Sequence, residues 1–314
     1  DGEYNKVLNG IPDWVYEEEF GFNRAFDFSA DSKMLAYIRF NESAVKMFSF
    51  PWYKGMAPEK MQYETYPGSY DYKYPKSGMQ NSLVSVHTFD IKSKVTRTMD
   101  LQLDKEDYIP RIRFTSDPEK LAIMVLNRHQ NRFDLYFANP RSTLCKVAIR
   151  DEAPQYIKEQ AYANIEFFDK NIVMMSERDG YNHLYLYTIG GNLVKQITKG
   201  DFEVKDFLGW DQNANVFYYT SNEESPLRTA VYKIDAKGKK TKLSTRVGTN
   251  SAIFSHSMKY YINTYSSIST PTRITINNNQ GKELKTLMDN AALKEKVARL
   301  NMPIKEFFTF TTSD

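Results

Sequence analysis

The chain has 314 residues, of which 41% are hydrophobic and 26% are charged, a composition typical of a globular protein. Its 42 Lys and Arg residues nearly balance 39 Asp and Glu residues and are spread along the chain, so we expect no nucleic-acid partner. The single cysteine, Cys145, excludes an internal disulfide and a cysteine-based zinc site.

The first notable segment along the chain is acidic, because Glu17, Glu18 and Glu19 are adjacent. Asp13 can accept hydrogen bonds at a helix N-terminus, and acids in a first helical turn are stabilised by the helix dipole. Neighbouring carboxylates repel one another unless water or a cation neutralises them. From spacing alone, residues 13–20 are predicted to form a capped helical turn exposed to solvent.

From about residue 22 onward the sequence repeats one plan, in which apolar strands alternate with polar or charged turns. The 22 Tyr and 20 Phe residues favour such strands. Four short strands recurring every roughly 40 to 55 residues are typical of propeller blades, whereas an immunoglobulin-like sandwich would not repeat a four-strand unit. We therefore predict an all-β fold, a partial β-propeller over residues 1–289 with four-stranded antiparallel blades. The blades are expected at about 22–101, 108–150, 163–200, 202–246 and 249–289.

The first blade is longer than the others because a Tyr-, Pro- and Gly-rich insertion interrupts it from Phe50 to about Gln80. Its strands are expected at Arg24–Phe28, Lys33–Phe40, Lys46–Phe48, Ser82–Asp90 and Val95–Leu101. About five blades are an awkward number for a closed ring, and an open propeller would expose strand edges. The sequence thus indicates either a fragment that lacks earlier blades or two fragments that pair.

After the last blade, Leu293, Val297 and Leu300 recur at helical spacing. This pattern predicts a short C-terminal exit helix within Asn290–Leu300, outside the core.

Four motifs, in order along the chain, resemble segments of the dipeptidyl peptidase IV family, within the prolyl oligopeptidase superfamily. The first is Asn-Gly-Ile-Pro-Asp-Trp-Val-Tyr-Glu-Glu-Glu-Phe at residues 9–20, which resembles the double-glutamate motif. The others are Tyr-Lys-Tyr-Pro-Lys-Ser-Gly-Met-Gln-Asn at 72–81, Ser-Glu-Arg-Asp-Gly-Tyr-Asn-His-Leu at 176–184 and Leu-Met-Asp-Asn-Ala-Ala-Leu at 287–293. Their order over nearly the whole chain is stronger evidence than any one motif.

The resemblance implies a role for two of the three glutamates. In that family a short helical segment projects from a blade, and two consecutive glutamates bind the free N-terminal ammonium of a peptide. Carried over, these substrate-binding residues are Glu18 and Glu19, and Glu17 takes no role. The chain would then be the substrate-gating propeller domain of a serine dipeptidyl peptidase that releases Xaa-Pro dipeptides. The alternatives are a prolyl tripeptidyl peptidase, or a non-catalytic interaction scaffold in which Glu17–Glu19 are surface acids.

The resemblance also implies what this chain does not contain. In the family, the catalytic Ser, Asp and His lie on an α/β-hydrolase domain after the propeller, with the nucleophile in a Gly-x-Ser-x-Gly elbow. The sequence holds no such pentapeptide. Residues 290–314 are expected to be the exit helix and a linker to that domain, so the fragment alone should be inactive. Expected partners are peptides with a free N-terminus, the hydrolase domain in cis and, by family analogy, a second copy. Family analogy also suggests a secreted or periplasmic, cell-envelope location.

The four histidines carry no metal-binding pattern. His87, His129, His183 and His256 lie in different repeats without metal-ligand spacing. We expect neither a metal nor a cofactor, and we interpret His183 as a packing residue of its blade.

Overall fold

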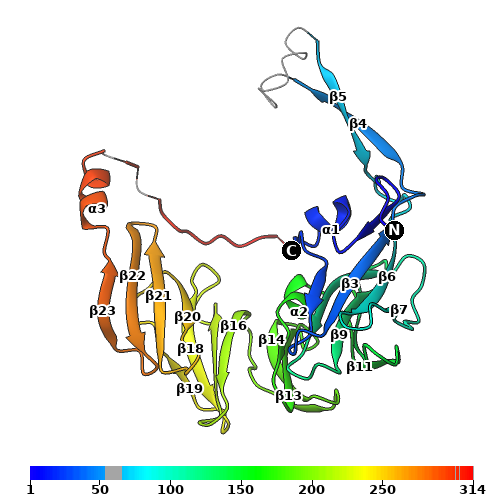
Figure 1. Ribbon diagram of the computed structural model, residues 1–314. Helices are drawn as coiled ribbons and strands as arrows, with labels where there is room; N and C mark the ends of the chain where they lie inside the picture. Colours follow the sequence, from blue (N-terminus) through cyan, green and yellow to red (C-terminus); the bar gives the residue numbers. More distant parts are fainter. Residues whose placement is uncertain (54–65, 301, 304, 314) are drawn as a thin grey trace. The chain divides into compact units, whose positions relative to one another are not determined.

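Alternating apolar and polar residues explain the strands of this protein, as β3 (Met34–Asn41) illustrates. Met34, Ala36, Ile38 and Phe40 are buried, whereas the residues between them are only partly buried. Successive side chains of a strand point to opposite faces, so this pattern gives one face to the core. The computed structural model describes residues 1–53, 66–300, 302–303 and 305–313, and its strands form antiparallel sheets (Figure 1).

Among the described residues, five sheets of four or five strands follow one another along the chain. The first contains β1 (Val7–Asn9), β2 (Phe26–Phe28), β3, β6 (Leu83–Asp90) and β7 (Thr96–Thr98). The second contains β8 (Tyr108–Phe114), β9 (Leu121–Leu126), β10 (Arg132–Ala138) and β11 (Cys145–Glu152). The third contains β12 (Glu166–Phe167), β13 (Asn171–Ser176), β14 (His183–Thr188) and β15 (Leu193–Gln196).

The last two sheets have the same plan. The fourth contains β16 (Val204–Asp211), β17 (Val216–Ser221), β18 (Ala230–Asp235) and β19 (Lys240–Lys242). The fifth contains β20 (Thr249–Phe254), β21 (Tyr260–Ser267), β22 (Thr270–Asn278) and β23 (Glu283–Met288). In the second to fifth sheets the strands lie side by side in chain order. The predicted all-β class, built from four-stranded antiparallel blades, is confirmed.

The chain divides into two compact units. The first comprises residues 1–178 and 186–195, and the second comprises residues 179–185 and 196–314.

The first sheet departs from the predicted plan at its edge strand. β1 pairs with the last residues of β3 (Val7 opposite Asn41), and β2 pairs with the beginning of β3 (Phe28 opposite Leu35). The two short strands together therefore occupy one edge position. The expectation that this blade begins near residue 22 was wrong, because Val7–Asn9 are also part of its sheet.

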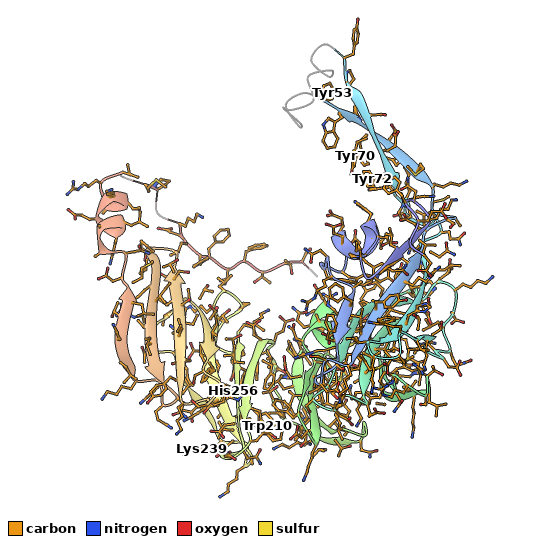
Figure 2. All side chains as sticks on the ribbon, viewed as in Figure 1. Tyr53, Tyr70, Tyr72, Trp210, Lys239 and His256 are labelled. Carbon is orange, nitrogen blue, oxygen red and sulfur yellow. The ribbon has the colours of Figure 1, made fainter. Side chains whose placement is uncertain are left out.

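The predicted insertion, Phe50 to about Gln80, includes residues 54–65, which lie outside the described residues. β4 (Met47–Trp52) and β5 (Gly68–Lys73) form a two-stranded ribbon that projects from the first sheet (Figure 1). The prediction of Lys46–Phe48 as a blade strand was wrong, since Met47 and Phe48 are the first residues of β4 and pair with β5 rather than with a strand of the first sheet. Aromatic rings on the two strands contact each other, with Phe50 and Tyr72 stacked at 5.2 Å, and Tyr70 and Tyr72 lie along the ribbon (Figure 2). Cross-strand aromatic contacts of this kind stabilise β-ribbons.

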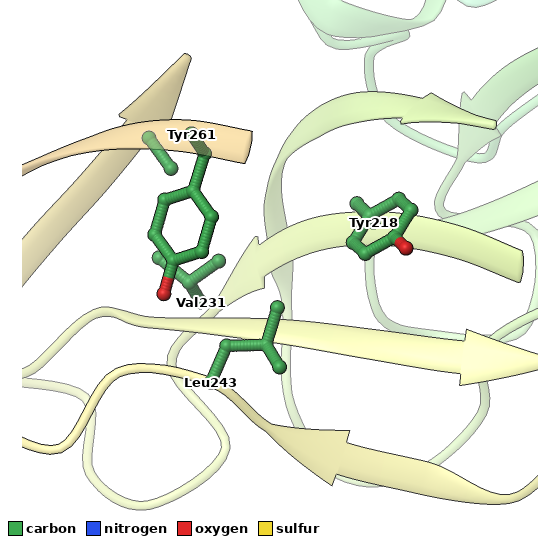
Figure 3. Packing of buried hydrophobic residues seen from close by; sticks show 5 residues of the cluster. Tyr218, Val231, Leu243 and Tyr261 are labelled. Carbon is green, nitrogen blue, oxygen red and sulfur yellow. The ribbon is translucent and has the colours of Figure 1, made fainter. Parts of the chain in front are cut away.

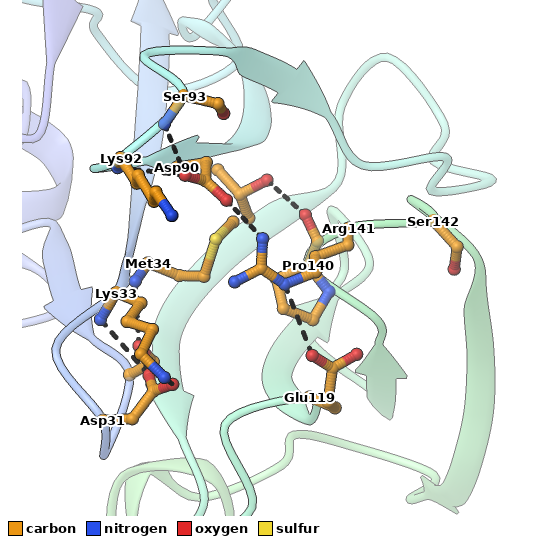
Figure 4. Close-up of polar contacts among 12 residues, drawn as sticks. Asp31, Lys33, Met34, Asp90, Lys92, Ser93, Glu119, Pro140, Arg141 and Ser142 are labelled. Carbon is orange, nitrogen blue, oxygen red and sulfur yellow. Dashed lines mark hydrogen bonds and ion pairs between the residues drawn. The ribbon is translucent and has the colours of Figure 1, made fainter.

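Polar contacts join the first and second sheets (Figure 4). Arg141, in the turn between β10 and β11, donates to the Asp90 carboxylate at the end of β6, and Thr88 Oγ1 donates to the Pro140 carbonyl at 2.8 Å. Hydrogen bonds from the Ser93 backbone and from Arg141 hold the pKa of Asp90 well below its usual 3.8. The charged carboxylate is therefore the form that the fold stabilises.

In the second unit an apolar cluster fills part of the space between the fourth and fifth sheets (Figure 3). Its buried members are Tyr218, Val231, Leu243, Ala252 and Tyr261. The basic run 237–242 lies at the hairpin between β18 and β19, where Gly238 has a φ of +84°. The basic run is therefore part of a hairpin turn.

The helices in the described part of the chain are short. α1 (Trp14–Glu18) and α2 (Glu159–Ala163) belong to the first unit, and α3 (Ala291–Ala298) follows the last strand. α3 has no buried residue, so the predicted exit helix lies outside the core. Among the residues that the structure describes, no helix is long and apolar enough to cross a membrane.

The turn between β14 and β15 leaves no room for a side chain at Gly191. Its φ is +90°, and a Cβ there would lie 1.9 Å from the Ala148 carbonyl oxygen. We predict that Gly191→Ala destabilises the chain by about 1–3 kcal/mol beyond the backbone cost, because overpacking forces the backbone to shift. Urea denaturation would measure this difference.

Gly238→Ala is the matched control, because its φ of +84° carries a similar backbone cost but nothing lies within 4 Å of the added Cβ. Equal denaturation midpoints for the two variants would contradict the prediction.

Candidate functional site

The segment that carries the three glutamates leaves and re-enters the first sheet at neighbouring points. The Gly10 N–H donates to the Ile38 carbonyl at 2.9 Å, and the Ile38 N–H donates to the Ala25 carbonyl at 2.9 Å. The Ala25 N–H in turn donates to the Gly10 carbonyl at 3.0 Å. These three bonds close the base of the excursion, so residues 11–24 form a loop fixed at both ends.

Asp13 begins α1 as predicted. Its Oδ1 accepts the Tyr16 N–H at 3.1 Å, and its Oδ2 accepts the Ser82 hydroxyl at 2.5 Å. The first bond satisfies one of the free N–H groups of the helix N-terminus. Burial raises the pKa of Asp13 above 3.8, although the bonds from Ser82 and Tyr16 act in the opposite direction. The predicted capped helical turn is confirmed, and its cap is buried.

Tyr16 anchors the underside of α1. Its side chain is 1% exposed, and its hydroxyl oxygen accepts the Ile109 N–H of β8 at 3.1 Å. The ring meets Phe40 of β3 at 4.8 Å and Phe20 at 5.1 Å between centroids. Tyr16 thus attaches α1 to the first and second sheets together.

Phe20 closes the segment after the glutamates. It is 2% exposed and packs against Tyr108 at 5.4 Å and Tyr162 of α2 at 6.1 Å. α2 was not predicted from the sequence, because a five-residue helix has too few residues to show a periodic pattern. Its contact with Phe20 becomes visible only in the folded chain.

The glutamates occupy the exposed end of this anchored segment. Glu18 is the last residue of α1 and Glu19 is its C-cap, with the Glu19 N–H donating to the Val15 carbonyl at 2.8 Å. Glu17, Glu18 and Glu19 are all exposed. Within the described part of the chain none of the three forms an ion pair, so their carboxylates are open to an external cation.

The second motif lies directly beside the first. Tyr74 packs on Trp14 of α1 at 4.1 Å between ring centroids. Burial, the neighbouring Tyr74 and Tyr70, and the negative charge of Glu18 together raise the pKa of the Tyr72 hydroxyl. The fold therefore brings Glu18 and residues 72–74 into one electrostatic environment, although more than fifty positions separate them in the sequence.

Two further residues, Tyr108 and Arg128, support the site and were missed by sequence reasoning. The Tyr108 hydroxyl accepts hydrogen bonds from Asn81 Nδ2 at 2.9 Å and from Arg128 Nη1 at 2.7 Å. Because Tyr108 also packs against Phe20, this network joins the second motif to the base of the glutamate segment. Tyr108 and Arg128 stand in ordinary strand and turn sequences, so no local pattern marks them.

Residues of the third and fourth motifs form hydrogen bonds within the fold. His183 is fully buried, with Nδ1 at 3.0 Å from Thr198 Oγ1 and Nε2 at 3.0 Å from the Gly200 carbonyl. In the fourth motif, Asn290 Nδ2 donates to the Thr272 carbonyl at 2.7 Å. Across the described residues, no three His, Cys, Asp or Glu side chains gather as a metal site requires.

We predict that Tyr16→Phe destabilises the chain by about 1–3 kcal/mol, because the buried Ile109 N–H loses its acceptor. Chemical denaturation would measure the change. Tyr4→Phe serves as control, since Tyr4 is 81% exposed and its substitution should leave stability unchanged. A Tyr16→Phe variant as stable as the parent would show that the hydroxyl does not anchor α1.

The raised pKa of Asp13 predicts how the stability of the fold depends on pH. A carboxyl whose pKa is higher in the native state stabilises the fold fully below its unfolded pKa, and this contribution is lost as the pH rises through the native pKa. Asp13→Asn keeps an acceptor for the Tyr16 N–H but removes the titration. The variant should therefore gain stability relative to the parent as the pH rises above 3.8.

Urea denaturation of both proteins over a pH series would test this difference. Asp31→Asn provides a control of opposite sign, because the hydrogen bond from Ser29 and the neighbouring Lys33 lower the pKa of Asp31. Parallel stability curves for Asp13→Asn and the parent would contradict the assignment.

Comparison with known proteins supports the relationship that the motifs indicated. The family described as the dipeptidyl peptidase IV (DPP IV) N-terminal region matches residues 1–272. Dipeptidyl peptidase 4 of Trichophyton rubrum and that of Arthroderma otae are each 31% identical over 96% of this chain. The chain spans about 40% of the length of these curated relatives.

Solved structures support the same relationship. The crystal structure of Porphyromonas gingivalis dipeptidyl peptidase 4 is 44% identical with a TM-score of 0.88, and the match covers 95% of this chain and 41% of that one. A putative dipeptidyl aminopeptidase IV from Bacteroides ovatus, 22% identical with a TM-score of 0.77 over 92% of this chain and 43% of that one, shares the fold. With four ordered motifs and a match over most of its length, the chain belongs to the family of dipeptidyl peptidase IV N-terminal regions.

Proposed function

We propose that this chain is the amine-binding propeller region of a serine-type dipeptidyl peptidase that releases Xaa-Pro dipeptides from peptide N-termini. Glu18 and Glu19 hold the free N-terminal ammonium of the substrate. The observation that carries the proposal is the pair of exposed carboxylates, free of ion pairs within the described residues, on a segment anchored by Asp13 and Tyr16.

In this role the two glutamates orient the substrate. An ammonium group donates three hydrogen bonds, and charge-assisted bonds to carboxylates are stronger than neutral ones. If the N-terminus is held at a fixed point, the number of residues that reach the nucleophile is fixed as well. The glutamates therefore position the substrate and exchange no proton with it.

The catalytic residues are proposed to lie in the remainder of the longer protein. The chain spans about 40% of its curated relatives, whose names describe them as dipeptidyl peptidases. We place the Ser, Asp and His residues on an α/β-hydrolase domain that follows this region in the same polypeptide. The expected partners are thus peptides with a free N-terminus and that domain in cis.

In the full-length protein, Glu18→Gln and Glu19→Gln should each lower kcat/KM for a free-amine Xaa-Pro reporter. Loss of one partner of a desolvated charge pair costs about 2–5 kcal/mol, which corresponds to a loss of roughly 30-fold to several thousand-fold. Glu17→Gln is the matched control, since Glu17 is equally exposed but has no proposed role. Steady-state kinetics of the three variants would check this.

Two further reporter substrates make this test decisive. An N-acetylated Xaa-Pro reporter should not be cleaved, because it has no ammonium to bind. An Xaa-Xaa-Pro reporter distinguishes a tripeptidyl peptidase, which would prefer it. Normal cleavage by the Glu18→Gln and Glu19→Gln variants would identify the glutamates as surface acids and favour an interaction scaffold.

A further inference from the structure

The interface between the fourth and fifth sheets has a polar half beside its apolar cluster. Asn250, Asn263, Thr275 and Asn277 are buried on the same face of the fifth sheet as Tyr261. They line a cavity of about 20 Å³, which the loop after β19 also borders through Arg246. Buried polar groups in such a place require hydrogen-bond partners.

Three polar atoms at this cavity have no hydrogen-bond partner among the residues that the structure describes. They are the Tyr261 hydroxyl, Asn263 Oδ1 and Arg273 Nε, and each is shielded from bulk solvent. Tyr261 and Asn263 are 2% and 8% exposed. Leaving several such groups unsatisfied together in one place would be costly, so the cavity calls for a shared partner.

The amide orientation of Asn263 follows from its neighbours. Asn250 Nδ2 donates to the carbonyls of Thr229 and Arg246, both at 3.1 Å, so Asn250 Oδ1 is its acceptor atom. Asn263 Nδ2 donates to that oxygen at 3.3 Å. The remaining atom of the amide, Asn263 Oδ1, is therefore an acceptor that requires a donor.

Arg273 presents the opposite requirement. Its Nη2 donates to Glu283 Oε1 at 2.6 Å and to Thr286 Oγ1 at 2.8 Å, which fixes the guanidinium. The Nε–H is then a donor that cannot turn to another acceptor. The Tyr261 hydroxyl can either donate or accept.

We infer that this cavity binds one ordered water molecule that joins Tyr261, Asn263 and Arg273. A site of about 20 Å³ exceeds the roughly 10–15 Å³ that one water needs and excludes organic ligands. Water donates to Asn263 Oδ1 and accepts from Arg273 Nε, which matches both requirements. Arg246 and Arg273 disfavour a cation, and Glu283 together with Asn263 Oδ1 disfavours an anion.

The Tyr261→Phe variant of the intact chain tests the inference by the sign of its effect. If the hydroxyl binds the water, its removal takes away a hydrogen bond and lowers the Tm. If the hydroxyl is unpaired, its removal relieves a buried polar group and raises the Tm. Tyr260→Phe is the matched control, because the adjacent Tyr260 is 50% exposed and its Tm should stay unchanged. A higher or unchanged Tm for Tyr261→Phe overturns the proposal.

Crystallography of the parent chain gives a readout that is independent of stability. We expect one density peak within about 3.2 Å of Tyr261 Oη, Asn263 Oδ1 and Arg273 Nε. Crystals grown in bromide instead of chloride should show no anomalous peak there. An empty cavity, or an anomalous bromide peak, would overturn the assignment of water.

Discussion

The pairing of β1 and β2 along one edge of β3 positions the whole candidate site. β3 holds β1 and β2 along the same edge, so residues 10 and 25 meet although the chain makes an excursion between them. Backbone hydrogen bonds among Gly10, Ala25 and Ile38 fix this meeting point. The edge of a sheet is thereby converted into a rigid base for α1, which carries Glu18 and Glu19.

Packing, rather than helix propensity, keeps α1 in place. A helix of five residues is far too short to be stable alone in water. Tyr16 and Phe20 are almost completely buried on either side of the glutamates, and burial of a large apolar side chain contributes about 1.5–3 kcal/mol. The glutamates are left exposed while Tyr16 and Phe20 pack against the first and second sheets.

The sheets of both units meet through apolar and polar contacts. In the first unit, strands such as β9, with the sequence Leu-Ala-Ile-Met-Val-Leu, are buried throughout, while Arg141 and Thr88 make polar contacts between the first and second sheets. In the second, the buried face of the fifth sheet alternates Tyr261 with Asn263 and Tyr265, so apolar packing and hydrogen bonding share one interface. A buried polar network is stable only when each member finds a partner, which makes this interface more selective about its geometry than an apolar one.

The sequence by itself determined the repeated four-strand plan, because the period-2 alternation and turn residues are local properties. It also located the acidic segment and the Asp13 cap, since a cap acts within three residues of the chain. Only the tertiary structure decided that Val7–Asn9 share an edge with Phe26–Phe28, and that Tyr74 packs on Trp14. It alone revealed Tyr108, Arg128 and α2 as the support of the glutamate segment. These contacts join residues tens of positions apart, and no local pattern records which distant side chains will meet when the sheets pack.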